Sequence, residues 1–175
     1  MVGTEAAPIK RILVIGCSGS GKSTLAARLG QRLALPYTPT DEVYWTGDWR
    51  PRPAAEVRAW ADTATSAESW VLDGNFDAER DLVWGRAELA VWLDFSLATT
   101  LWRVSRRNFG WLLSGQPVWG GQRMTLAKAL SGVRHSLRSH AGKRGAYPSL
   151  LAGFPQLQAV RLTSPRDAET WLAGL

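Results

Sequence analysis

Glycine, lysine and hydroxyl side chains gather near the start of the chain, in the run Gly16-Cys17-Ser18-Gly19-Ser20-Gly21-Lys22-Ser23, with Thr24 behind it. The spacing Gly-x-x-x-x-Gly-Lys-Ser is that of the phosphate-binding P-loop. In such a loop the glycines turn backbone N–H groups into a concave nest that opens onto a helix N-terminus, and both features favour a polyanion. Lys22 would reach the β- and γ-phosphate oxygens, and the Ser23 hydroxyl would bind Mg²⁺.

This motif predicts a site for ATP and Mg²⁺. The plain alternative is a glycine-rich turn between a strand and a helix. The apolar run Ile12–Ile15 before the loop and the helical spacing of Leu25 and Leu29 after it favour the P-loop. The residues expected to hold the nucleotide are Gly16, Ser18, Gly19, Ser20, Gly21, Lys22, Ser23 and Thr24.

Three aspartates stand at or just beyond the ends of expected strands, where ligands bind in open α/β sheets. Asp73 follows Trp70-Val71-Leu72 and is expected to hold Mg²⁺ through water together with Ser23, although it could simply cap the turn before Gly74. Asp41 could orient a substrate hydroxyl or accept its proton, and its plain alternative is a loop carboxylate. Asp94 is expected to cap the following helix together with Ser96, so it stays outside the site.

Basic residues dominate the second half of the chain. From Phe95 to Arg166 there is no Asp or Glu, whereas eleven Lys or Arg residues occupy positions 103, 106, 107, 123, 128, 134, 138, 143, 144, 161 and 166. Such clustering of one sign indicates a polyanionic partner. That partner is either nucleic acid or the phosphates of the nucleotide, and the second explanation needs no extra ligand.

Four of these arginines form two pairs with a spacing of four residues, so each pair projects from one helical face. The pairs are Arg103 with Arg107, and Arg134 with Arg138. A guanidinium group offers a planar fork and a permanent charge, which suits a transferring phosphoryl group. With Lys22 and Asp41, these four arginines are the predicted catalytic residues.

The aromatic and histidine side chains suggest smaller roles. Trp45 and Trp49 could wall a pocket beside Asp41, and Trp111 and Trp119 could belong to a mobile lid. Four other tryptophans fit core or half-buried positions, namely Trp60, Trp92, Trp102 and Trp171. His135 and His140 have no metal-ligand spacing with a cysteine or an acid, so no metal beyond Mg²⁺ is expected.

The elements that must position these residues alternate between strand and helix. The strands are expected at residues 12–15, 37–38, 70–73, 90–94 and 159–162, and helices at 22–33 and 54–66. Ser96 and Ser164-Pro165 should each begin a further helix, the first with Leu97, Leu101 and Val104 facing the core. Another helix carries Leu126, Leu130, Val133 and Leu137 as its expected core stripe, whereas residues 108–124 lack periodicity. This order predicts an α/β fold, a P-loop NTPase three-layer sandwich with a five-stranded parallel sheet and a short helical lid.

Composition sets the remaining limits. A chain of 175 residues with a net charge of +6 is expected to form a single domain, with residues 1–9 as a loose leader that lacks the pattern of a signal peptide. The apolar runs are strand-sized, so no membrane span is expected. The single cysteine, Cys17, agrees with a reducing compartment and a cytoplasmic location. We expect a monomer or a weak dimer.

The motifs together resemble the adenylate-kinase-related P-loop kinases, and most of all the bacterial DNA topology modulation proteins. The resemblance covers nearly the whole chain from Arg11 and is carried by the P-loop, Asp41-x-x-Tyr44-Trp45, residues 71–76 (Val-Leu-Asp-Gly-Asn-Phe), residues 91–94, Arg103 to Arg107 and residues 160–162. It implies an acceptor-binding region at residues 44–69, a lid at about 108–133 without zinc, and a nucleotide base near Ser164 and Pro165. Nucleoside monophosphate kinases carry Asp-Gly-Phe-Pro-Arg where this chain has Asp-Gly-Asn-Phe, so Arg80 or Arg86 would have to replace the missing arginine.

The resemblance and the motifs together predict an enzyme that moves the γ-phosphoryl group of Mg·ATP to a small-molecule acceptor. Two alternatives stay open at this point. One is a nucleotide-dependent protein that binds nucleic acid, which the basic half of the chain would suit. The other is a nucleotide sensor without catalysis.

Overall fold

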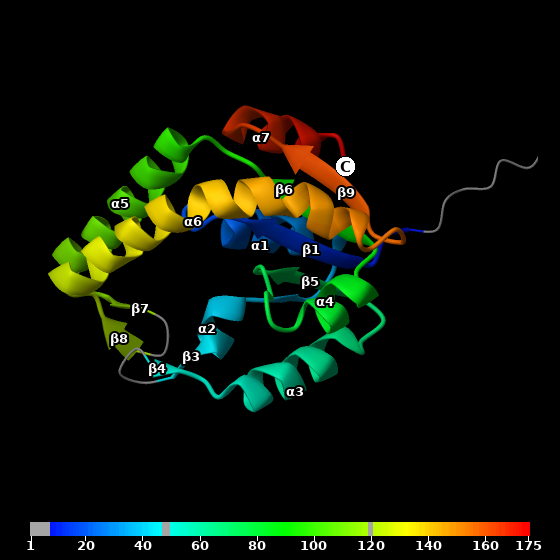
Figure 1. Ribbon diagram of the computed structural model, residues 1–175, viewed down its shortest axis with the longest axis horizontal. Helices are drawn as coiled ribbons and strands as arrows, with labels where there is room; N and C mark the ends of the chain where they lie inside the picture. Colours follow the sequence, from blue (N-terminus) through cyan, green and yellow to red (C-terminus); the bar gives the residue numbers. More distant parts are fainter. Residues whose placement is uncertain (1–7, 47–49, 119–120) are drawn as a thin grey trace, which may run out of the picture.

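The computed structural model describes residues 8–46, 50–118 and 121–175 of the chain (Figure 1). Its centre is a five-stranded sheet in the order β2-β5-β1-β6-β9, in which every neighbouring pair is parallel. The strands are β1 (Arg11–Gly16), β2 (Tyr37–Thr38), β5 (Trp70–Asp73), β6 (Leu89–Leu93) and β9 (Gln158–Leu162). The predicted parallel sheet is confirmed, with strand ends shifted by about one residue.

Helices cover both faces of this sheet, which explains why its central strands are continuous apolar runs. On one face, α1 (Lys22–Leu33) and α7 (Pro165–Ala173) pack with the sheet around Val14, Leu29 and Leu172. On the other face, the core around Leu13, Ala61 and Trp84 joins the sheet to α3 (Ala54–Thr65) and α4 (Arg80–Arg86). The three-layer arrangement is therefore as predicted.

The remaining elements stand around the carboxyl ends of the strands, where the P-loop lies (Figure 1). A short helix, α2 (Thr40–Tyr44), follows β2 and leads into a hairpin of β3 (Trp45–Thr46) and β4 (Arg50–Pro51). The two long helices α5 (Leu97–Ser114) and α6 (Leu126–Ala152) run side by side and are joined through a hairpin of β7 (Pro117–Val118) and β8 (Gln122–Arg123).

The element boundaries that were predicted around the lid are wrong. Residues 108–124 were expected to be aperiodic, but α5 continues through this stretch to Ser114 and ends at Gly115, whose φ is 63°. Ser96 caps the start of α5 as predicted, by accepting a hydrogen bond from the Thr99 N–H at 3.2 Å. The expected lid at 108–133 thus consists of two helix ends and a short hairpin. The first residues of the expected leader lie outside the described part of the chain, whereas Ile9 packs against the core.

The α6 helix is held to the rest of the molecule along one face, at positions three or four residues apart. The contacts join Ser136 Oγ to Ser18 O (3.0 Å), His140 Nε2 to Phe95 O (2.9 Å), Arg144 Nε to Asp94 Oδ1 (3.2 Å) and Tyr147 Oη to Asn75 Oδ1 (2.7 Å). These partners belong to the P-loop and to the segments that follow β5 and β6. The helix is therefore fixed to the end of the sheet where the P-loop lies.

The expected core stripe of α6 is not buried, which corrects the sequence analysis. Leu126, Leu130 and Leu137 are exposed, Leu137 to 52%. The face of α6 that packs inward carries small or polar residues such as Ala129 and Ser136, and hydrophobic periodicity cannot detect such a face. Trp102 on α5, expected to be at least half buried, is 60% exposed.

Candidate functional site

The P-loop connects β1 to α1, and its backbone has the conformation that the glycines permit. The φ angles are 150° at Gly16, 83° at Gly19 and 94° at Gly21. At Gly19 a side chain would also place its Cβ atom 2.5 Å from Thr100 O in α5, so only glycine fits. Gly21 is the N-cap of α1, which leaves the N–H groups of the first helical turn available to an anion. Lys22 Nζ donates to Cys17 O at 3.1 Å across the loop.

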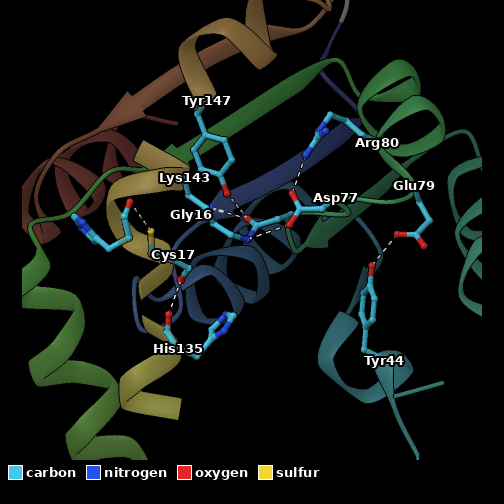
Figure 2. Close-up of polar contacts among 12 residues, drawn as sticks. Gly16, Cys17, Tyr44, Asp77, Glu79, Arg80, His135, Lys143 and Tyr147 are labelled. Carbon is cyan, nitrogen blue, oxygen red and sulfur yellow. Dashed lines mark hydrogen bonds and ion pairs between the residues drawn. The ribbon is translucent and has the colours of Figure 1, made fainter. Parts of the chain in front are cut away.

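Side chains that are distant in sequence hold this loop in shape. The Gly16 N–H donates to Asn75 Oδ1 at 3.2 Å, and the same oxygen accepts the Tyr147 hydroxyl (Figure 2). Arg103 Nη1 donates to Ser20 O at 3.1 Å, and its guanidinium group lies over the ring of Phe95. The loop therefore depends on α5, α6 and the segment after β5.

The end of β5 brings together the two oxygen ligands that the sequence predicted for Mg²⁺. The Ser23 hydroxyl donates a short hydrogen bond to Asp73 Oδ2. The other carboxylate oxygen accepts from the Tyr37 hydroxyl at 3.2 Å and from the Thr40 N–H at 3.1 Å, so the carboxylate is fixed in orientation. A hydroxyl and one carboxylate fit Mg²⁺, which prefers oxygen ligands and usually retains several waters. In the described part of the chain, no group of three or more His, Cys, Asp or Glu residues could hold another metal ion.

The P-loop opens into a cavity of about 1190 Å³. At one end its walls come from α1 and α7, and at the other from α2, the β3–β4 hairpin, α3 and the segment 74–79. The helices α5 and α6 form a third side. Of the predicted catalytic residues, Lys22, Asp41, Arg103 and Arg107 line this cavity, as does Asp73, which the sequence predicts to hold Mg²⁺.

Burial changes the acid–base properties of these groups. It raises the pKa of Asp41 above its usual range, an effect that the positive charges of Lys22 and Arg107 oppose. It also lowers the pKa of Lys22, although the nearby carboxylates of Asp41 and Asp73 act in the opposite direction. Asp41 therefore holds a proton more readily than an exposed aspartate does, and it faces the cations that would meet phosphate oxygens.

Comparison with solved structures identifies the fold that holds this cavity. Two solved structures match almost the whole chain: a gluconokinase from Sinorhizobium meliloti 1021 (19% identity, TM-score 0.52, 94% of this chain and 92% of that one) and a shikimate kinase from Acinetobacter baumannii in complex with shikimate (15% identity, TM-score 0.57, 95% and 90%). The chain has the P-loop kinase fold.

Comparison of sequences finds a match to only part of the chain. No family model matches the chain. An uncharacterized protein of Bacillus subtilis, YqaC, is 32% identical over 102 residues, and the match spans 57% of this chain and 57% of that relative. The chain therefore aligns with little more than half of the relative's length. The narrower resemblance to the DNA topology modulation proteins stays a prediction.

Within this P-loop kinase fold, Arg134 and Arg138 are not brought to the cavity, contrary to the sequence prediction. Both are exposed on α6 and neither lines the cavity. The cause is helical phase: each precedes a cavity-lining residue, His135 or Ser139, and successive residues of a helix point about 100° apart. Of the two predicted pairs, only Arg103 and Arg107 reach the site.

Two lysines and a histidine of α6 line the cavity instead, and sequence reasoning missed them. They are Lys128, His135 and Lys143, whose spacing of seven and eight residues keeps them on one face. Lys143 Nζ forms an ion pair with Asp77 Oδ2 at 3.3 Å, which links α6 to the segment after β5 (Figure 2). The spacing of Lys128 and Lys143 places both on one helical face, but the sequence does not show that this face, rather than the face of Arg134 and Arg138, lies toward the cavity.

The end of the cavity away from α7 is aromatic and acidic. Tyr44 Oη donates to Glu79 Oε2 at 2.9 Å (Figure 2). The ring of Phe76 lies between Tyr44 and Trp60, with centroids 6.2 and 6.4 Å away. Burial and the bond to Glu79 raise the pKa of Tyr44, so its hydroxyl stays a donor.

Neither proposed substitute for the missing acceptor arginine lines the cavity. Arg80 pairs with Asp77 and lies over the ring of Trp84, and Arg86 pairs with Asp62.

The other candidate residues line the cavity, have structural roles or lie outside the described residues. Trp45 and Trp111 line the cavity, whereas Trp49 and Trp119 fall outside the described part of the chain. Asp94 does not cap α5, because it is buried and holds Arg144 and Arg161. Burial raises the pKa of the Cys17 thiol, which suits a packing role in the P-loop.

None of the described helices is long and apolar enough to span a membrane.

Proposed function

We propose that the protein is an ATP-dependent phosphotransferase that moves the γ-phosphoryl group of Mg·ATP to a hydroxyl group of a small molecule. One observation carries this proposal. The P-loop lysine, the Ser23–Asp73 pair, Asp41 and Arg107 all line one cavity at the carboxyl ends of the strands. At about 1190 Å³ the cavity exceeds the range of about 300–1,000 Å³ typical of a single small-molecule site, which suits two reactants side by side.

In the proposed reaction, the acceptor oxygen forms a bond to the γ-phosphorus while the bond from that phosphorus to the β–γ bridging oxygen breaks. ADP leaves, and the hydroxyl proton of the acceptor passes to Asp41. A carboxylate with a raised pKa suits this task, because it keeps the proton more readily than an ordinary aspartate. The loose transition state needs positioning and charge stabilisation rather than covalent help.

The cations of the cavity supply that stabilisation. Lys22 and Arg107 face the region where negative charge develops, and Arg103 holds the P-loop through Ser20 O. Ser23 and Asp73 would hold Mg²⁺, which would supply positive charge to offset the negative charge of the phosphates. The predicted lid at about residues 108–133, which would close over the reactants, belongs to the same proposal.

The test is ADP release from Mg·ATP with a panel of nucleosides, nucleoside monophosphates and hydroxylated metabolites. We expect one acceptor to stimulate release strongly, and Lys22→Ala to abolish this stimulation in a folded protein. Arg138→Ala is the matched control, since Arg138 is an exposed cation outside the cavity. Unchanged turnover in folded Lys22→Ala protein would refute the proposal.

The exposed arginines outside the cavity favour a second candidate, a nucleotide-dependent protein that binds nucleic acid. Arg106 lies over the exposed ring of Trp102, and Arg134 and Arg138 are exposed on the neighbouring helix. This candidate predicts binding to short DNA or RNA that weakens steeply with salt and responds to ATP. ADP release stimulated only by nucleic acid would favour it over the small-molecule kinase.

A further inference from the structure

The carboxylates of the cavity differ in what balances their charge. Asp73 is held by hydroxyl and N–H donors at the proposed Mg²⁺ site, and Asp41 faces Lys22 and Arg107. Asp77 pairs with Arg80 and Lys143, and Glu169 pairs with Arg28. Glu79 lines the same cavity, and among the described residues it forms no ion pair; its hydrogen-bond partner is the neutral hydroxyl of Tyr44.

Glu79 is buried, with 3% of its surface exposed, at the end of the segment that leads into α4. Its Oε2 accepts the Tyr44 hydroxyl, as Figure 2 shows. A carboxylate has about four acceptor positions, so one neutral hydroxyl leaves most of this capacity unused. A buried charge without a cationic partner is unfavourable, and a ligand group that donates hydrogen bonds or carries positive charge would relieve it.

The walls beside Glu79 suit a hydroxylated ring or chain. Phe76 is buried and has a φ of 49°, a conformation that costs energy in a residue other than glycine and recurs at functional sites. Its ring lies against Tyr44 and is stacked on Trp60, so it forms a fixed apolar wall. Thr40, which also lines the cavity, is 2% exposed and its hydroxyl oxygen has no hydrogen-bond partner among the described residues.

At the same end of the cavity, the side chains of the described arginines Arg52 and Arg80 are already engaged. The Arg52 side chain uses Nε on Val43 O at 2.8 Å and Nη1 on Glu56. Arg80 is engaged by Asp77 and by the ring of Trp84. An anionic acceptor would therefore meet Glu79 without the bidentate guanidinium partner that carboxylates usually have.

We infer that the acceptor is an aminated polyol or aminated cyclitol: its ammonium group binds Glu79, its apolar face contacts Tyr44 and Phe76, and a hydroxyl group lies at Asp41. This inference rests on the proposed function and names the substrate class of the same site. Phosphoryl transfer follows the scheme above, with the acceptor hydroxyl as nucleophile, its proton passing to Asp41, and ADP as the leaving group.

The test is calorimetric binding of three probes that share a six-carbon hydroxylated chain and differ in charge: gluconate, sorbitol and glucamine. The protein is saturated with Mg²⁺ and a non-hydrolysable ATP analogue, so turnover plays no part. We expect affinity to rise from gluconate to sorbitol to glucamine, with glucamine about tenfold or more tighter than gluconate, as a hydrogen bond to a charged group would give. Glu79→Gln should reduce the advantage of glucamine over sorbitol to within about twofold.

The matched control is Glu42→Gln, which removes the same charge from an exposed position of α2 outside the cavity and should preserve the order. Equal or tighter binding of gluconate, no binding of any probe, or an unchanged order in folded Glu79→Gln would overturn the inference. If Glu79→Gln does not fold, the order in the unmodified protein decides alone. If gluconate stimulates ADP release and Lys22→Ala abolishes this stimulation, the proposed kinase activity stands and the aminated acceptor is refuted. Failure of the inference is thereby distinguished from failure of the proposed function.

Discussion

The close approach of Gly19 to α5 gives a prediction whose size follows from the geometry. A Cβ atom at Gly19 would lie 2.5 Å from Thr100 O and 3.1 Å from Val104 Cβ, and the φ of this glycine is 83°. The left-handed backbone costs a side chain about 1–2 kcal/mol. Because the nearest atom is a backbone oxygen, the contact cannot be relieved by a rotamer change, and overpacking adds about 1–3 kcal/mol. Gly19→Ala should therefore lower the free energy of unfolding by about 2–5 kcal/mol.

Gly115 provides the matched control, because its φ is 63° and nothing lies within 4 Å of an added Cβ atom. Gly115→Ala carries the backbone cost alone, about 1–2 kcal/mol. Thermal and urea unfolding of both variants measure the difference, and for a chain of this size each kcal/mol lowers Tm by about 2–4 °C.

ATP affinity of folded Gly19→Ala, measured by calorimetry below its Tm, should also fall, whereas Gly115→Ala should bind ATP as the parent does. A Gly19→Ala protein as stable as Gly115→Ala would refute the reasoning, since the clash with α5 would then cost nothing.

Three further predictions concern the cavity and its support. Burial raises the pKa of Asp41, so kcat/KM should fall as pH is lowered, with an apparent pKa above the ordinary aspartate value of about 3.9. Asp41→Asn should lower kcat and remove this loss of activity at acid pH from the pH–rate profile. Arg107→Ala should lower kcat about 10²-fold or more while Arg134→Ala leaves it unchanged; equal effects in steady-state kinetics would contradict the placement of these arginines. Asp94→Ala should lower the free energy of unfolding by about 1.5–3 kcal/mol, because the buried carboxylate accepts two hydrogen bonds from Arg161. An unchanged midpoint in urea unfolding would show that stability does not depend on this pairing.

Local patterns in the sequence predicted the parts of this molecule that depend on local physics. The P-loop, its strand and its helix follow from glycine spacing and an apolar run, and α1 begins and ends at the predicted residues. Asp73 and Asp41 were found because strand ends share one edge of a parallel sheet. The cap at Ser164 was also predicted, and its hydroxyl accepts from the Asp167 N–H at 3.1 Å.

The errors arose where tertiary contacts override local pattern. The inward face of α6 is chosen by hydrogen bonds from Ser136 and His140 to distant backbone oxygens, and neither residue contributes to a hydrophobic stripe. This choice rotates the leucine stripe outward and moves Arg134 away from the cavity. The short helices α2 and α4 were missed because five and seven residues are too few for periodicity to be detected.

The supports of the P-loop have a consequence for the order of folding. Its eight residues are contiguous in the chain, yet Gly16, Ser18 and Ser20 are held by Asn75, Ser136 and Arg103, which lie 59, 118 and 83 residues away. Contacts of such separation require costly loop closure and form slowly. The nucleotide nest is therefore complete only when α5 and α6 have docked, and ATP binding should appear among the last events of refolding. By mass action, a nucleotide bound there stabilises the whole chain rather than one loop.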